Sequence, residues 1–393
     1  TGDGLLRVRD HGAVVAEIPN RALADEAPLY NRPYTKPRQL APPDAPQFES
    51  ASLEADLLKI LGSGDVCSKR WIWEQYDYMV RTNTTAGPGG DAAIVRIKET
   101  NTSVAMSLDG NGRFSGLDPR EGAKLLVAEC CRNLSTVGAQ PIAATNNLNF
   151  GNPERPEIMA QLVETIEGMA EACAFFETPI TGGNVSLYNE TLGDAIFPSP
   201  VLGIVGLLDT AAPVAIPFKN EGRDVLLMGG FGRPDAGRFV GTQYAKQVVG
   251  EFWGKPPALD MDYEKRVQAA IREIARKGLA ESAHDLSDGG LAVALAECTF
   301  GGMGAAIEVD FDVRPELLLF DESPSRILVS TANAEEVKKI ALFHGVESPR
   351  IGVTIKERLR IGNGPATLID CSLDNLRGAW DQALNRSLHP EHV

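Results

Sequence analysis

Two kinds of hydrophobic periodicity run along this chain, and together they predict helices and strands in one fold. Apolar residues recur at the 3.6-residue spacing of a helix most clearly over residues 118–138 and 156–176. The same spacing predicts further helices over residues 52–62, 263–277, 286–298 and 334–343. Short apolar runs predict strands over residues 92–97, 103–108, 200–208, 225–228, 306–309 and 326–330, with a last strand near residue 358. Because helices and strands are mixed without strict alternation, we expect an α+β fold.

Proline-rich and polar stretches interrupt this pattern at two places. Residues 4–17 read as a strand, a turn and a strand, and residues 22–29 as a helical turn. Residues 33–46 contain five prolines, which fix φ and remove backbone donors, so this stretch is expected to be an extended connector. A second boundary is expected over residues 213–222. The strand-like opening suggests the tail of an earlier domain, and thus a piece of a longer polypeptide.

The composition is that of an ordinary globular protein, with 43% of the 393 residues hydrophobic and 23% charged. No apolar run approaches the ~18–20 residues of a membrane span, and no secretory signal opens the chain. The net charge of −15 would repel a phosphate backbone, so we expect neither nucleic acid nor a membrane as a partner. Six scattered cysteines include no C-x-x-C pair, which favours reduced thiols and a cytoplasmic location.

Two asparagine-rich segments are candidate binding regions. Residues 145–154 (TNNLNFGNPE) place four asparagines after a strand, which is typical of a turn scaffold or a binding loop; a turn rarely needs so many, so binding is favoured. Residues 181–190 (TGGNVSLYNE) form a glycine-rich loop in which Gly183 allows close backbone approach. Asn184 and Ser186 then offer neutral polar contacts to a phosphate, a metal or a sugar. The alternative for this loop is a tight turn, since it lacks the ending of a Walker loop.

A third candidate combines acidic residues with glycines. Residues 282–291 (SAHDLSDGGL) place His284 and Asp285 before two glycines and an apolar helix. One histidine with two acids, Asp285 and Asp288, could suggest zinc, but no second histidine or cysteine lies at ligand spacing. Asp285 is a better chemical match to Mg²⁺, which prefers oxygen ligands. The alternative is that Asp285 and Ser287 cap the following helix.

Three more polar residues have an ordinary structural interpretation when taken alone. Asp91 follows two glycines just before a predicted strand. Glu129 and Asn133 are four residues apart on a predicted helix, so they lie on one face, which is usually a solvated one. The glycine-rich run at 229–237 lacks G-x-G-x-x-G spacing and is interpreted as a structural turn.

Taken together, several stretches resemble one family, the large subunit of phosphoribosylformylglycinamidine synthase (PurL) of purine biosynthesis. The matching stretches are EQYD (74–77), GGDAAIVRI (89–97), SLDGNGR (107–113), DPREGA (118–123), LNFGNPERPE (148–157), GGNVSLYNET (182–191), HDLSDGGL (284–291) and ESPSR (322–326). The resemblance covers about residues 1–385, and its LNFGNPE and GNVSLYNE blocks are long and specific.

The resemblance implies an architecture of PurM-like halves, each similar to aminoimidazole ribonucleotide synthetase and made of an N-terminal and a C-terminal α/β domain. This chain matches the second half, preceded by the end of the first. The implied parts are closing strands of a preceding domain and a linker in 1–46, an ATP-binding domain of the N-terminal type in 47–212, and a domain of the C-terminal type in 213–393. The sheet of the N-terminal-type domain is expected to pair with a partner domain.

The activity implied by the resemblance is ATP-dependent amidine formation. ATP phosphorylates the amide oxygen of formylglycinamide ribonucleotide to an iminophosphate, and ammonia from glutamine displaces phosphate to give formylglycinamidine ribonucleotide. The chemistry needs Mg²⁺ to neutralise the transferring phosphoryl group. We expect the chain to be inactive alone, as part of a longer enzyme.

The family pattern also implies residue roles. By matching position, Asn146 and Gly183 would contact ATP, Asn184 would hold Mg²⁺, and Ser186 would contact the substrate. The family often carries Asp at the position of Asn146. Compared with that Asp, the Asn146 side chain has the same hydrogen-bonding reach but no negative charge. An auxiliary nucleotide site with magnesium in long relatives corresponds to metal ligands Asp91, Glu129, Asn133 and Asp285, with Ser287 beside the nucleotide. The catalytic histidine belongs to the first half, so His284 is not assigned as a base and this half has no catalytic residue.

Two alternatives remain beside a half of a purine-pathway ligase. One is a non-catalytic half that only holds nucleotide and organises a complex. The other is a stand-alone enzyme similar to aminoimidazole ribonucleotide synthetase, against which the opening 46 residues and the LNFGNPE block argue. The implied partners are the missing N-terminal half, a glutaminase, a small accessory subunit and the ribonucleotide substrate. Without its first half, the chain is expected to form a homodimer through residues 90–150.

Overall fold

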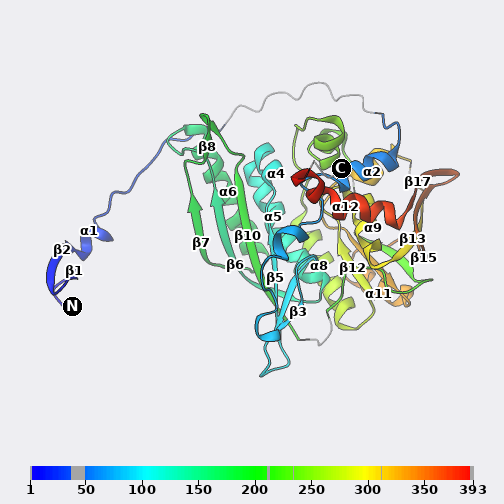
Figure 1. Ribbon diagram of the computed structural model, residues 1–393, viewed down its shortest axis with the longest axis horizontal. Coiled ribbons are helices and arrows are strands. Elements are labelled where there is room, and N and C mark those ends of the chain that lie inside the picture. Colours follow the sequence, from blue (N-terminus) through cyan, green and yellow to red (C-terminus); the bar gives the residue numbers. More distant parts are fainter. Residues whose placement is uncertain (1, 37–48, 210–212, 233, 311, 390–393) are drawn as a thin grey trace.

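A computed structural model describes residues 2–36, 49–209, 213–232, 234–310 and 312–389. These residues form a small N-terminal hairpin and two α/β domains that lie side by side (Figure 1). The α+β architecture expected from the pattern is confirmed. No described helix is both long and apolar enough to cross a membrane.

The N-terminal hairpin lies apart from the rest of the chain, at the left of Figure 1. Strands β1 (Leu5–Asp10) and β2 (Ala13–Pro19) pair antiparallel, as predicted for residues 4–17. The helical turn expected at 22–29 is wrong in position: the short helix α1 (Asn20–Leu23) begins two residues earlier and ends six residues earlier. Apolar side chains on both strands are exposed, so the hairpin has no core of its own among the described residues. Most of the expected proline-rich connector lies outside the described residues.

The first domain is built on a six-stranded sheet in the order β3-β4-β5-β10-β6-β7. Its strands are β3 (Thr84–Ala86), β4 (Ala93–Arg96), β5 (Ser103–Asp109), β6 (Gln140–Asn149), β7 (Ile180–Ser186) and β10 (Ser199–Leu208), with a small ribbon β8 (Glu190–Thr191) and β9 (Asp194–Ala195) beside them. Its helices are α4 (Gly112–Leu117), α5 (Pro119–Thr136) and α6 (Pro156–Phe175). The predicted strands and the two long helices are confirmed to within two residues at each end.

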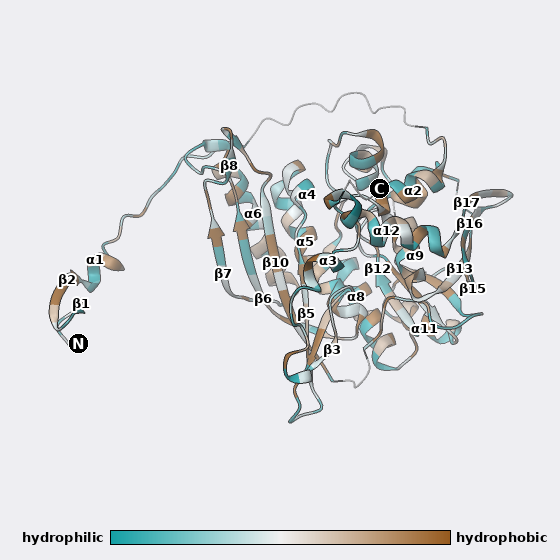
Figure 2. Cartoon of the chain, viewed as in Figure 1, coloured by the Kyte–Doolittle hydropathy of each residue, from teal (hydrophilic) through white to brown (hydrophobic). Residues whose placement is uncertain are grey.

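Only one face of this sheet is covered by helices within the described chain. Along β5 and β10, Ala105 and Leu202 point to the core beneath α5 and α6. Their neighbours Met106, Leu108 and Leu207 point the other way and are between 38% and 75% exposed. Figure 2 shows a long apolar stretch along β10. The opposite face is therefore open, and apolar along β5 and β10.

A proline in the first turn opens each of the two long helices, and α5 also has a capping side chain. The Asp118 carboxylate accepts from the backbone N–H groups of Arg120 and Glu121, and Pro119 occupies the first turn of α5. Pro156 likewise opens α6. The two helices cross where Gly168 approaches Arg120: a Cβ at position 168 would lie 2.3 Å from the Arg120 carbonyl oxygen. Only glycine allows this crossing.

The second domain contains a seven-stranded sheet in the order β12-β14-β11-β15-β13-β16-β17. Its strands are β11 (Asp224–Met228), β12 (Ser282–Asp285), β13 (Met303–Val309), β14 (Ile327–Thr331), β15 (Arg350–Lys356), β16 (Arg358–Asn363) and β17 (Ala366–Ser372). Its helices are α7 (Ala236–Phe239), α8 (Met261–Arg276), α9 (Gly290–Cys298), α10 (Pro315–Phe320), α11 (Ala334–Phe343) and α12 (Leu373–Leu388).

Both faces of the second sheet are buried. Val225 and Leu227 point into the core formed with α9, α10 and α12, whereas Leu226 and Met228 point into the core formed with α8 and α11. Helix α2 (Leu53–Leu61), capped by Ser52 as predicted, packs Leu57 into the first of these cores. It thus belongs by packing to the second domain, although it lies within the range expected for the first. The short helix α3 (Arg70–Trp73) follows it.

Two expectations about local structure were wrong, and some elements were not expected. Residues 145–149 and 180–186 are not loops but the parallel strands β6 and β7, whose polar residues are tolerated because this edge of the sheet is solvated. The helix predicted for 286–298 begins only at Gly290, because Gly289 and Gly290 adopt φ of +80° and +65°. The pattern also gave no sign of β15, β17 or α12.

The close crossing of α5 and α6 at Gly168 can be tested by substitution. We expect Gly168→Ala to lower the free energy of unfolding by about 1–3 kcal/mol, because the added methyl group meets rigid backbone rather than a movable side chain. Urea unfolding followed by circular dichroism measures this. Gly378→Ala in α12 is the matched control: nothing lies within 4 Å of its Cβ, so it should be neutral or stabilising by up to about 1 kcal/mol. Equal effects of the two substitutions would contradict the crossing.

Candidate functional site

The candidate site lies where the two domains meet, between α5 of the first and β12 and α8 of the second. Of the residues singled out in sequence, Asp91, Asn133 and Asp285 come into direct contact here, and Glu129 lies one turn before Asn133 on α5. The fold thus brings Asp91 and the polar end of β12 together, although they are nearly 200 residues apart in sequence. We call Asp91, Asp109, Glu129, Asn133 and Asp285 the carboxylate cluster.

His284 holds one side of the carboxylate cluster as a cation. Its Nδ1 lies 2.7 Å from Asp91 Oδ1 and its Nε2 lies 2.8 Å from Glu297 Oε2. Burial opposes the charged imidazole, but Asp91 and Glu297 outweigh it and hold the pKa of His284 well above its usual value. In its protonated form His284 would donate from both ring nitrogens, which suits its two carboxylate partners.

Arg132 is the second buried cation of the site and comes from the first domain. Its guanidinium lies 3.1 Å from both Glu264 oxygens and 3.2 Å from Asp285 Oδ2, and the residue is 1% exposed. Glu264 also accepts from the Ser325 hydroxyl at 2.5 Å. The Asn133 side-chain amide donates to Asp285 Oδ1 at 2.9 Å. These contacts fix the Asp285 carboxylate from two directions.

Two other acids of the cluster, Asp109 and Glu129, form no ion pair with a cation in the described part of the chain, unlike Asp285. Burial raises the pKa of Asp109 to about 7, with Asp288 and Asp285 adding to the effect and the Gly110 N–H opposing it. Burial and the negative charge of Asp109 raise the pKa of Glu129 well above its usual value. Burial also raises the pKa of Asp285 to about 6, although Arg132 opposes the shift. Such shifts mark a place where an added cation would be stabilised.

Two cavities adjoin the cluster. One of about 10 Å³, enough for about one water molecule, is lined by Glu129, Arg132 and Ser287. The other, of about 200 Å³, lies on the far side of Asp91 and is lined by residues 86–92 and 213–217. The cluster therefore has room for an ion on one side and for a larger group on the other.

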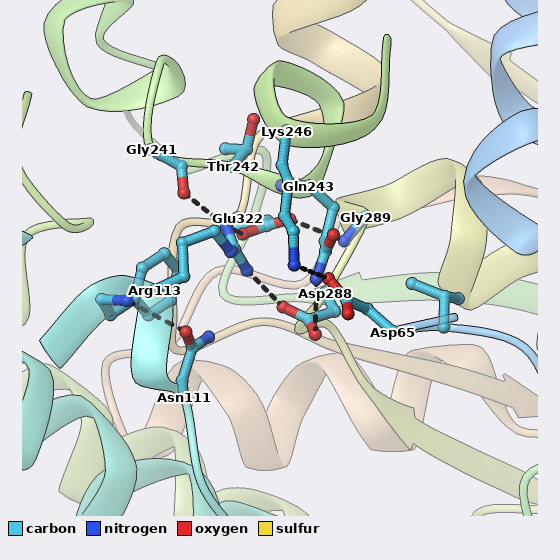
Figure 3. A network of polar contacts seen from close by, with 12 residues as sticks. Asp65, Asn111, Arg113, Gly241, Thr242, Gln243, Lys246, Asp288, Gly289 and Glu322 are labelled. Carbon is cyan, nitrogen blue, oxygen red and sulfur yellow. Dashed lines mark hydrogen bonds and ion pairs between the residues drawn. The ribbon is translucent and has the colours of Figure 1, made fainter. Parts of the chain in front are cut away.

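A second buried arginine joins the domains beside the cluster (Figure 3). Arg113 of α4 donates to Glu322 Oε2 at 2.9 Å, to Asp288 Oδ1 at 2.6 Å and to the Gly241 carbonyl. Glu322 in turn accepts from the backbone N–H groups of Gln243 and Gly289 at 2.7 and 2.8 Å. This network explains why the ESPSR and HDLSDGGL segments lie together.

Position 285 ends strand β12, so Asp285 does not cap a helix, and neither does Ser287. Helix α9 begins at Gly290 after Gly289, without a side-chain cap. The alternative interpretation of these two residues as helix caps was therefore wrong.

The remaining sequence-derived residues lie on β6 and β7, at the other edge of the first sheet. Asn146 and Gly183 are partners in the parallel register, and a Cβ on Gly183 would lie 2.0 Å from Asn146 Oδ1. Asn184 donates to Asn147 Oδ1 at 3.1 Å, and Ser186 contacts Asn189 at 3.2 Å. Since side chains alternate along a strand, Asn184 and Ser186 share the open face and Gly183 faces the other way.

Sequence reasoning missed four residues of the site. Arg113 and Asp109 lie in the SLDGNGR stretch, which was recognised as a block without a role for either residue. Arg132 and Glu264 lie on long helices, where a charged residue is ordinarily exposed. Only the position of Arg132 beside Glu129 and Asn133 could have pointed to a role.

The comparisons with known proteins agree with this two-domain arrangement. The family description "AIR synthase related protein, N-terminal domain" matches residues 89–208, and "AIR synthase related protein, C-terminal domain" matches residues 220–362. The chain belongs to the AIR synthase related family. Its expected resemblance to PurL within that family is confirmed by the phosphoribosylformylglycinamidine synthase subunit PurL of Moorella thermoacetica. That protein is 45% identical over 392 residues, which are 98% of this chain and 53% of the relative.

Solved structures give the same fold. Two structures of T. maritima PurL, complexed with ATP and with FGAR, match with TM-scores of 0.66 and 0.68. Each is 21% identical and covers 84% of this chain, and the match spans 52% and 54% of their chains. At this identity the likeness concerns the PurM-like fold alone. The chain spans about half the length of the curated relatives it matches.

The buried acids predict a dependence of stability on pH. Between pH 4 and 7, Asp109 keeps its proton in the folded state and loses it in the unfolded state, so the free energy of unfolding falls as pH rises. We expect Asp109→Asn to make this fall shallower between pH 5 and 7.5, in urea titrations with EDTA present. Asp310→Asn serves as the control, because Asp310 is exposed just after the end of β13. It should leave the dependence of the free energy of unfolding on pH unchanged. An unchanged slope in Asp109→Asn would contradict the raised pKa.

Proposed function

We propose that this chain is part of an ATP-dependent ligase that converts formylglycinamide ribonucleotide, ammonia from glutamine and ATP to formylglycinamidine ribonucleotide, ADP and phosphate. The observation that carries the proposal is the similarity to a PurL subunit over 98% of the chain, together with the convergence of the matching motifs at the domain interface. Because the chain spans about half of that relative, we expect it to act as a part of the enzyme and to be inactive alone.

The carboxylate cluster supports a magnesium and ADP site in this half. Oxygen ligands suit Mg²⁺, and the buried acids Asp109 and Glu129 lack a compensating cation, so the donor set fits the ion. Asp91, Glu129, Asn133 and Asp285 would hold it, with Ser287 near the nucleotide. When bound, Mg²⁺ would neutralise phosphate charge. The residues of the chain prepare the site: Arg132 and Asn133 orient Asp285, and His284 orients Asp91.

The pair of strands β6 and β7 supports a second set of contacts, at the edge that another half would complete. Here Asn146 and Gly183 would contact ATP, Asn184 would hold Mg²⁺ and Ser186 would contact the ribonucleotide. The absence of a side chain at position 183 supports this role, since any Cβ would collide with Asn146. The printed descriptions of the T. maritima structures, with ATP and with FGAR, are consistent with both ligands.

The alternative of a non-catalytic, nucleotide-holding half has one observation in its favour. The cluster is tied together by His284, Arg132 and Asn133, which is what a site that holds rather than turns over a ligand requires. The two roles can coexist in one enzyme, with the cluster structural and the edge of β6 and β7 contributing to turnover.

The proposed partners follow from the open sheet face and from the missing half. In the complete enzyme the N-terminal half would cover this face, and a glutaminase and a small accessory subunit would supply ammonia; the relative is named a subunit. The chain alone would pair with a second copy through residues 90–150. Six free cysteines, all buried, are consistent with a reducing, cytoplasmic location.

Gly183 gives the direct test of the proposed activity. Co-expression of this chain with an N-terminal half of a PurL relative should restore ADP release that depends on ribonucleotide and ammonia, and the chain alone should give none. Gly183→Val should then lower kcat/KM at least about 100-fold, because its side chain displaces Asn146 from the nucleotide position. Gly182→Ala is the matched control, since nothing lies within 4 Å of its Cβ. Turnover by the chain alone, or equal loss in both variants, would refute the assignment.

The open sheet face predicts a homodimer of the isolated chain. We expect sedimentation to show a dimer at micromolar concentration, and Leu108→Glu to convert it to monomer because it buries a charge in an apolar interface. Leu342→Glu on α11, where the leucine is 78% exposed on the second domain, should leave the dimer intact. A monomeric unaltered chain would rule out this pairing.

A further inference from the structure

One asparagine of strand β6 differs from the other two in what its side chain contacts. Asn146 Nδ2 donates to the Met169 sulfur at 3.6 Å, and Asn149 Nδ2 donates to two backbone carbonyl oxygens at 3.1 and 3.2 Å. Asn147 is exposed on the open face of the sheet, where its Oδ1 accepts from Asn184 Nδ2 of β7 at 3.1 Å. Asn147 is thus the asparagine of β6 whose side chain meets β7.

The contact between Asn147 and Asn184 follows from the register of the sheet. The two residues are direct partners in the parallel pair of β6 and β7, so their side chains leave the sheet on the same face. On its other flank, Asn147 is paired with Val201 of β10. Because the backbone of Asn147 is held in the sheet on both sides, its side chain is kept next to that of Asn184.

The direction of this hydrogen bond decides which end of the Asn184 amide is free. Asn184 donates through Nδ2, which leaves its Oδ1 without a hydrogen-bond partner among the described residues. A hard cation binds an amide through its oxygen. If the Asn184 amide turned over, its Oδ1 would face the Asn147 Oδ1, and two acceptors repel each other. The Asn147 carbonyl oxygen therefore favours the orientation in which Asn184 Oδ1 can meet a cation.

We infer, on the basis of the magnesium contact proposed for Asn184, that Asn147 is a positioning residue. It holds the Asn184 amide so that Oδ1 stays free for the cation. Asn147 acts through Asn184 and needs no contact of its own with the ion or the nucleotide. When a supporting residue of this kind is lost, metal affinity typically falls about 10- to 100-fold.

The part of nucleotide binding that depends on metal tests this role without reference to turnover. In the chain assembled with an N-terminal half of a PurL relative, the Kd of the ATP analogue AMPPNP is measured by calorimetry with Mg²⁺ and with EDTA. The ratio of the two values is the gain in affinity due to the metal. Asn184→Ala should lower this gain and so identify the binding event that belongs to β6 and β7. Any binding at the carboxylate cluster should stay unchanged and serves as an internal reference.

Two substitutions of Asn147 separate positioning from direct contact. Asn147→Leu removes the acceptor at similar size, so the gain due to Mg²⁺ should fall about tenfold or more, whereas the Kd in EDTA should change less than about threefold. Asn147→Asp loses the donor of Asn147 but keeps an oxygen that can only accept, so Asn184 must still donate and the gain should be retained. Val201→Ala, on the other flank of Asn147, is the control and should also retain the gain.

The outcomes distinguish this inference from the proposed function. An unchanged gain in Asn147→Leu, or an equal loss in Asn147→Leu and Asn147→Asp, would overturn the positioning role while leaving the magnesium contact of Asn184 intact. An equal loss in Val201→Ala would overturn it as well, because any disturbance of the sheet would then have the same effect. No effect of Asn184→Ala on any binding event would overturn both.

Discussion

The fold depends on the placement of one buried positive charge, that of Arg132, between two domains. A buried arginine is tolerated when carboxylates meet its charge. Here the two terminal nitrogens of Arg132 face Glu264 and Asp285 of the other domain, whereas its buried Nε has no partner among the described residues. Removing one partner of such a set leaves the others buried and uncompensated, which typically costs about 3–5 kcal/mol. The relative position of the two domains is thereby specified, and with it the position of every residue of the cluster.

Arg113 makes a second buried contact between the domains, with Glu322 and Asp288 as partners (Figure 3). Two arginines on neighbouring helices of the first domain thus meet carboxylates of the second. A hinge between the domains would have to break both sets at once. A ligand of the cluster would therefore have to enter without opening of the two domains.

Much of the fold could be predicted from the sequence, because the helices α5 and α6 and the strands β5 and β10 follow regular periods and both helices open with a proline. The polar strands β6 and β7 could not, since their asparagines and glycines are typical of loops and only the solvated edge of the sheet makes them acceptable. The site followed the same division. Asp91, Asn133 and Asp285 were found through motifs, whereas Arg132 and Asp109 acquire their roles from contacts made across 150 residues of sequence, which no local pattern encodes.

The open face of the first sheet carries both the exposed Leu108 and Met106 and the polar pair Asn184 and Ser186. The assembly and the ligand contacts proposed for this chain draw on one surface, so the two equilibria would be thermodynamically linked: whatever favours one favours or opposes the other by the same factor. If the covering domain belongs to a separate chain, ligand binding would consequently depend on protein concentration. Dilution would then weaken binding even where every side chain remained in place.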